Sequence, residues 1–215
     1  MNRMTPLHRG LLYISIAFSA IYLVSLTAAP YPGQFAVKAV PAVLLAILAL
    51  KAVRGLVGKL LFTALLFCAA GDVALALDGE QFFVTGLLFF LIAQVLFIVT
   101  FSRDLRKRRS RLPIIIILVV YAAIMAAVLR PVLGDLMIPV FFYIAVITTM
   151  GVLAALRAAE SKLVLYGALS FIISDSLIAI NEFAVSLPAS GYIIMATYYS
   201  ALFLITTGYP KDEGK

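Results

Sequence analysis

The sequence has few of the side chains on which most metal sites and most soluble folds depend. Its 215 residues include one cysteine, Cys68, and one histidine, His8, and only 13% of the residues are charged. A single cysteine excludes an internal disulfide and argues against a cysteine-based metal site. A single histidine excludes a histidine-rich zinc centre. The low charge also excludes soluble enzymes and nucleic-acid-binding modules, because about a quarter of the residues in soluble domains are charged.

What the sequence has instead is long apolar stretches, and these predict an all-α protein that crosses a membrane. Hydrophobic residues make up 64% of the chain. A spanning helix needs about 20 apolar residues, and eight stretches approach or reach this length. Their predicted bounds are 10–28, 34–53, 58–77, 82–101, 113–130, 134–157, 161–181 and 187–208. The short connections predict antiparallel packing of neighbours in one polytopic helical bundle, a single integral membrane domain over residues 1–215.

The positive charges support this number of spans and orient the chain. With eight spans, 15 of the 17 Lys and Arg residues fall on one side of the membrane. The positive-inside rule assigns that side to the cytoplasm, so both termini are predicted to be cytoplasmic. The exceptions are Arg130, at the end of a predicted helix, and Lys38, which lies inside one. Lys38 either extends toward the interface or serves a site within the membrane.

Two aspartates lie inside predicted spanning helices, where an ionisable side chain is costly and by default marks a functional site. Asp72 lies in the third apolar stretch and Asp175 in the seventh. Both stretches run outward from the cytoplasm in the predicted topology, so both aspartates fall in the outer half of the membrane, which also holds Lys38. A shift of 103 residues aligns Asp72 with Asp175. This shift suggests two four-helix halves, although chance similarity between leucine- and alanine-rich helices would explain it as well.

The chemistry predicted for these aspartates follows from their proximity. Two carboxyl groups close together in a low dielectric cannot both ionise easily, so one retains its proton. The result is a general acid beside a carboxylate, which suits acid-catalysed cleavage of a lipid bond. The alternatives are a proton relay in a transporter, and a non-catalytic or lipid-binding protein in which Lys38 bridges a structural pair.

Other polar side chains in the spans are expected to line a substrate cleft together with Lys38. Each of them alone is typical of helix packing. Glu182 is expected on the same helix face as Asp175, because seven residues correspond to two turns. The residues expected to bind substrate are Lys38, Gln94, Tyr143, Glu182 and Tyr198.

Several short motifs occur in a characteristic order along the chain. They are Lys38-Ala-Val-Pro41, Gly71-Asp72, the segment from Phe82 to Gln94, the segment from Gly167 to Asp175, and Tyr198-Tyr199. This ordered set resembles the YhhN-type lysoplasmalogenase family of multi-span membrane proteins. The resemblance implies eight spans and hydrolysis of the vinyl-ether bond of lysoplasmalogens. The products would be a fatty aldehyde and glycerophosphocholine or glycerophosphoethanolamine, and no metal or organic cofactor is implied.

The resemblance also implies roles for individual residues. The aspartates of the family's motifs match Asp72 and Asp175, and its lysine matches Lys38, which would hold the substrate phosphate. Where the family often has a histidine, this chain has Gln94, whose amide forms hydrogen bonds but does not act as an acid or base near neutral pH. The expected partners are a lysophospholipid substrate and membrane lipid, with no nucleic acid. The expected location is the inner membrane of a bacterium or an endomembrane of a eukaryote.

Overall fold

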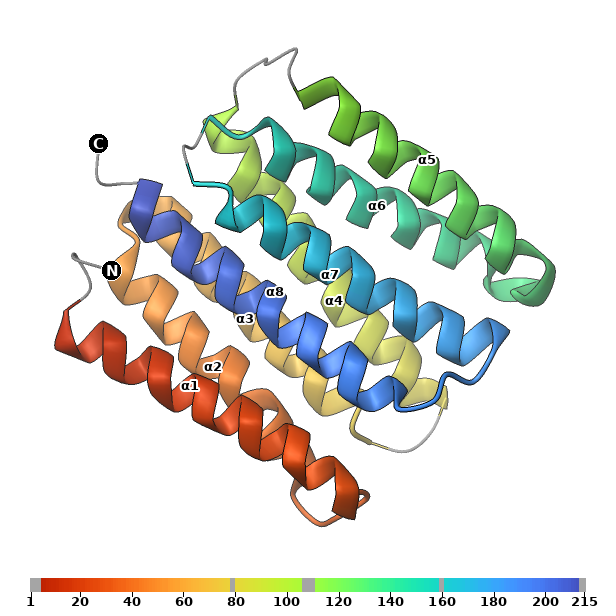
Figure 1. Ribbon diagram of the computed structural model, residues 1–215, viewed down its shortest axis with the longest axis horizontal. Coiled ribbons are helices and arrows are strands. Elements are labelled where there is room, and N and C mark those ends of the chain that lie inside the picture. The colour runs from red at the N-terminus through yellow and green to blue at the C-terminus, as the bar shows by residue number, and fades with distance from the viewer. Residues whose placement is uncertain (1–4, 78–79, 106–110, 159–160, 213–215) are drawn as a thin grey trace. The chain divides into compact units, whose positions relative to one another are not determined.

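The computed structural model describes residues 5–77, 80–105, 111–158 and 161–212, and its regular elements are helices (Figure 1). Eight of the described helices are long and apolar enough to cross a membrane, which confirms the predicted polytopic all-α fold. The orientation of the termini stays a prediction, and residues 106–110 of the basic connection lie outside the described part. The long helices are α1 (Pro6–Ser25), α2 (Gln34–Ala52), α3 (Gly55–Ala74), α4 (Glu80–Phe101), α5 (Leu112–Leu129), α6 (Met137–Leu156), α7 (Leu163–Ala179) and α8 (Ser190–Asp212).

The helix starts follow from local sequence. The Thr5 side chain accepts a hydrogen bond from the backbone N–H of His8 at 3.3 Å, and Pro6 occupies the first position of α1. Both are typical of a helix N-terminus. Gly33 precedes α2 with a φ of 82°, a left-handed conformation that glycine adopts without steric cost. Pro113 lies in the first turn of α5, where a missing N–H removes no helical hydrogen bond.

The chain divides into two compact units. The first contains α1 to α4 together with the residues of α8 from Thr206 onward, and the second contains α5, α6, α7 and α8 up to Ile205. In the first unit α2 packs against both α1 and α3, and in the second α6 packs against both α5 and α7. The predicted boundary between the two four-helix halves also follows α4. A symmetry between these halves stays a prediction.

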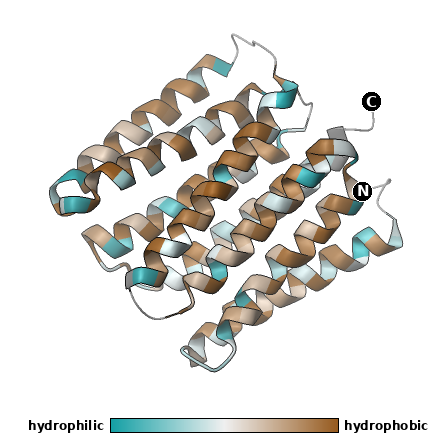
Figure 2. Ribbon diagram, turned by 180° about the vertical axis from the view of Figure 1, so that it is seen from behind, coloured by the Kyte–Doolittle hydropathy of each residue, from teal (hydrophilic) through white to brown (hydrophobic). Residues whose placement is uncertain are grey.

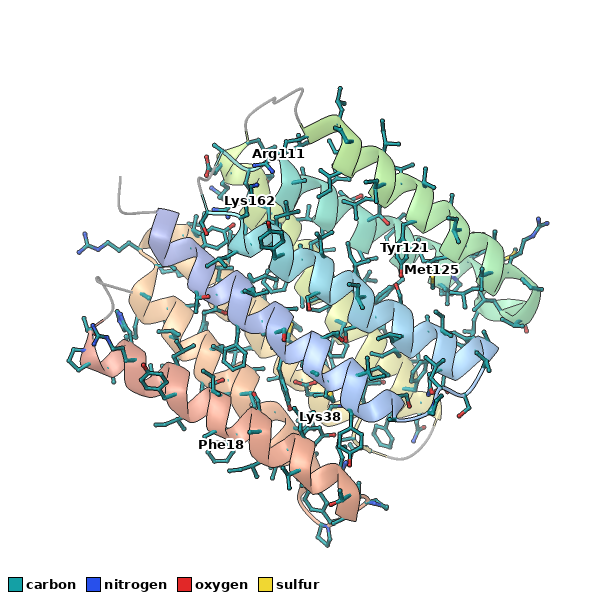
Figure 3. All side chains as sticks on the ribbon, in the orientation of Figure 1. Phe18, Lys38, Arg111, Tyr121, Met125 and Lys162 are labelled. Atoms are coloured by element: carbon teal, nitrogen blue, oxygen red, sulfur yellow. The ribbon has the colours of Figure 1, made fainter. Side chains whose placement is uncertain are left out.

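Hydrophobic residues cover most of each helix, and hydrophilic residues lie largely near the helix ends and in the connections (Figure 2). Large apolar side chains such as Ile117 and Ile138 are 65% and 77% exposed. Apolar exposure of this extent on helices of spanning length is what a lipid bilayer covers. In the second unit Arg111 and Lys162 lie at the same end (Figure 3), as expected for charges that flank a span.

Two glycines bring helices close together near the aspartates. Gly71 of α3 directly precedes Asp72 in sequence. A Cβ atom on Gly71 would lie 2.8 Å from the ring of Phe90 on α4. A Cβ atom on Gly167 of α7 would lie 2.9 Å from the carbonyl oxygen of Ala201 on α8. Small residues at such points allow spanning helices to approach closely.

Candidate active site

Asp72 and Lys38 lie buried on the packed helices α3 and α2 of the first unit. Asp72 is 1% exposed and Lys38 is 7% exposed. The Asp72 carboxyl group is near enough to interact electrostatically with both Lys38 and Tyr22 of α1. The Gln34 side-chain amide donates a hydrogen bond to the Tyr22 hydroxyl at 3.4 Å. Three helices therefore contribute polar groups to a cluster around Asp72, which we call the Asp72 cluster.

The burial of Lys38 decides between the two interpretations of this lysine. Lys38 follows the start of α2 by about one turn, and Pro41 lies within the helix three residues later. Proline has no N–H to donate along the helix, but the Pro41 carbonyl oxygen accepts a hydrogen bond from the Ser15 hydroxyl of α1 at 3.0 Å. This buried bond joins α1 to α2 close to Lys38. The lysine is therefore a buried partner of Asp72 and does not extend toward the interface.

Gln94 is fully buried on α4. It follows Phe90 by four residues, and the Phe90 ring is the group that packs over Gly71 of α3. Residues four apart share a helix face, so Gln94 lies on the face of α4 that packs toward α3. The structure thus brings Gln94 to the same helix pair as Asp72.

Asp175 lies buried on α7 in the second unit and is held by a neighbouring helix. The hydroxyl of Tyr143 on α6 donates a hydrogen bond to Asp175 Oδ2 at 2.5 Å. The adjacent residue, Ser174, donates from its hydroxyl to the Ile194 carbonyl oxygen of α8 at 3.1 Å. The segment that carries Asp175 is therefore tied to both α6 and α8.

Tyr198 of α8 is buried and lies close to the helix that carries Asp175. Its ring meets the ring of Phe171 on α7 edge-on, with the ring centroids 5.9 Å apart and an interplanar angle of 75°. Phe171 precedes Asp175 by one helical turn. Tyr198, Tyr143 and Asp175 thus belong to one set of packed helices, which we call the Asp175 cluster.

After α7 the chain continues as a π-helical turn over Ile180–Ala184. The α-helical period that predicted Glu182 on the face of Asp175 therefore ends before Glu182, and this placement stays a prediction. The Glu182 side chain is exposed, and a role in substrate binding stays a prediction.

Tyr22 belongs to the Asp72 cluster, although no sequence pattern predicts it there. A tyrosine in an apolar helix is usually a packing residue, and no motif marks this one. Only the packing of α1 on α2 brings it near Asp72. Within the part of the chain that the structure describes, no three or more His, Cys, Asp or Glu side chains gather as a metal ion would require. The two aspartates belong to different units, and their pairing stays a prediction.

Comparison with known proteins gives consistent matches. The profile of the YhhN family matches residues 33–209. The chain is 34% identical over 154 residues to the human lysoplasmalogenase TMEM86A, covering 67% of this chain and 62% of that protein. It is 35% identical over 182 residues to the lysoplasmalogenase of Mycobacterium bovis, covering 82% of this chain and 70% of that protein. The chain thus spans about 62% of the length of the human and bovine TMEM86A proteins that it matches. No solved structure matches the chain.

Proposed function

The chain belongs to the YhhN family, and on this premise we propose that it is a lysoplasmalogenase, a membrane hydrolase that cleaves the vinyl-ether bond of lysoplasmalogens. The observation that carries the proposal is the similarity to proteins named lysoplasmalogenase over 67% to 82% of the chain. A lipid substrate also agrees with eight helices that are able to cross a membrane. The proposed location is the inner membrane of a bacterium or an endomembrane of a eukaryote.

The reaction needs an acid, a base and one water molecule. A carboxyl group first donates its proton to the alkenyl carbon that does not bear oxygen, and the π electron pair forms the new C–H bond. The positive charge is then shared between the adjacent carbon and the ether oxygen. Water adds to that carbon and loses a proton to a carboxylate, giving a hemiacetal. The hemiacetal hydroxyl then gives its proton to a carboxylate, the C–O bond to the glycerol oxygen breaks, and that oxygen takes up a proton from a carboxyl group, which releases the fatty aldehyde and the glycerol hydroxyl. Proton transfer of this kind is general acid–base catalysis.

We assign the proton transfers to Asp72 and Asp175. Each is buried in its own unit among polar partners, and a buried carboxylate also stabilises a developing cation more strongly than one in water. Lys38 lies beside Asp72 and supplies positive charge. A substrate phosphate would bind to this lysine. Gln94 and Tyr198 are the proposed lining residues on α4 and α8.

The proposal is tested with three lysophosphatidylcholines of equal chain length, which carry an alkenyl, an alkyl or an acyl chain. The purified protein in detergent micelles is expected to release aldehyde from the alkenyl lipid alone, because the alkyl ether has no double bond to protonate. Fatty acid release from the acyl lipid would identify an esterase instead. Absence of any product from folded protein, together with solute uptake driven by a pH gradient, would support the transporter alternative.

A further inference from the structure

A side-chain hydrogen bond in the Asp175 cluster joins Asp175 to Tyr143. The phenol oxygen lies 2.5 Å from Asp175 Oδ2, and the two residues are 32 positions apart, on α6 and α7. A phenol that donates to a carboxyl oxygen fixes the rotation of the carboxyl group. It therefore also fixes the direction in which the other oxygen, Oδ1, faces.

The backbone around this contact is held firmly as well. A Cβ atom on Gly151 of α6 would lie 2.7 Å from the side chain of Ile172 on α7, so the two helices are in close contact about two turns from Tyr143. On the other side of α7, the Ser174 hydroxyl donates to the Ile194 carbonyl oxygen of α8. The phenol and the carboxyl group are thus carried by helices whose spacing is fixed by packing. Such support is what a precisely placed reacting group requires.

We propose that Tyr143 is a positioning residue for Asp175, which holds Oδ2 and thereby directs Oδ1 toward the reacting carbon or water. This inference rests on the proposed hydrolase function and changes the part expected of Tyr143, from contact with substrate to control of a catalytic carboxyl group.

Two tyrosines lie near Asp175 in its unit. Tyr143 faces it from α6, and Tyr198 packs from α8 against Phe171. Tyr121 of α5 packs in an apolar cluster with Met125, Leu129, Leu133 and Val140 (Figure 3). Glu182, on the turn that follows α7, is exposed.

The test is the Tyr143→Phe variant, which keeps the ring and removes only the hydroxyl. We expect kcat to fall by about 10- to 100-fold with KM nearly unchanged, since a misplaced reacting group affects the chemical step. Tyr121→Phe, the same change on a neighbouring helix, is the matched control and leaves both quantities unchanged.

A second measurement does not depend on activity. Infrared difference spectra recorded during acid titration contain the C=O stretch of each protonated carboxyl group, and the Asp175 band is the one lost in Asp175→Asn. In Tyr143→Phe this band is expected at a higher wavenumber, because the carboxyl group has lost a hydrogen bond to its oxygen. Tyr121→Phe again serves as control.

The outcomes separate the two proposals. A wild-type protein that hydrolyses no vinyl ether would refute the proposed function, and the infrared band would still decide whether Tyr143 controls Asp175. A Tyr143→Phe variant with a raised KM and an unchanged kcat would overturn the inference and return Tyr143 to the substrate-binding residues. An Asp175 band that does not move would overturn it as well.

Discussion

Replacing Lys38 by methionine is expected to destabilise the protein strongly, because it removes the cation beside a carboxyl group that is almost fully buried. Asp72 is 1% exposed and Lys38 is 7% exposed, and the two interact electrostatically. Methionine retains most of the length of the lysine stem, so packing changes little and charge changes most. Removal of one member of a buried ion pair costs about 3–5 kcal/mol.

The free energy of unfolding is measured by titration with sodium dodecyl sulfate in mixed micelles, followed by circular dichroism. Lys51→Met is the matched control, since Lys51 is exposed on the same helix, and it should change stability by no more than about 0.5 kcal/mol. The Lys38→Met, Asp72→Asn double variant removes both charges and should be more stable than the sum of the single effects predicts, by about 0.5–3 kcal/mol. A stable Lys38→Met variant, or strictly additive effects, would refute the reasoning.

Two further predictions concern helix packing. Gly167→Ala is expected to destabilise the protein by about 1–3 kcal/mol, because the new methyl group would lie 2.9 Å from the Ala201 carbonyl oxygen, a backbone atom that cannot rotate away. A Cβ atom on Gly10 would have no neighbouring atom within 4 Å, so Gly10→Ala should be neutral or stabilising by up to about 1 kcal/mol. Equal melting temperatures for the Gly167→Ala and Gly10→Ala variants would contradict this expectation. Ser15→Ala removes the 3.0 Å hydrogen bond to the Pro41 carbonyl oxygen. The free energy of unfolding, measured by the same titration, should fall by about 0.5–1.5 kcal/mol. An unchanged free energy of unfolding would show that this bond does not stabilise the α1–α2 contact.

The spans could be predicted from the sequence because hydrophobic length is a local property. All eight predicted stretches correspond to helices of spanning length. The third differs by three residues at each end, with 58–77 predicted and Gly55–Ala74 observed. The helix begins earlier because its first turn includes residues that carry no long apolar signal. The buried positions of Asp72 and Asp175 followed from the same local pattern.

Contacts between helices could not be predicted in this way. Tyr143 was singled out as a polar group in a span, but its bond to Asp175 joins residues 32 positions apart, and no spacing rule connects them. Tyr22 was missed for the same reason, since its place near Asp72 depends on how α1 packs on α2. The seven-residue spacing does not determine the face of Glu182, because a π-helical turn interrupts the α-helical period after Ala179. A local change of helix type has no distinct signal in hydrophobicity.

The most direct test of the account is the rate of aldehyde release from lysoplasmenylcholine by the wild-type protein and by the Asp72→Asn and Asp175→Asn variants. The substitutions keep the side-chain shape and remove the acid–base chemistry, so circular dichroism should confirm equal helix content before rates are compared. The account predicts that the wild-type protein releases aldehyde and that each variant loses about 10²- to 10⁴-fold in kcat. Aldehyde release that persists at the wild-type rate in both variants, or that is absent from folded wild-type protein, would contradict it.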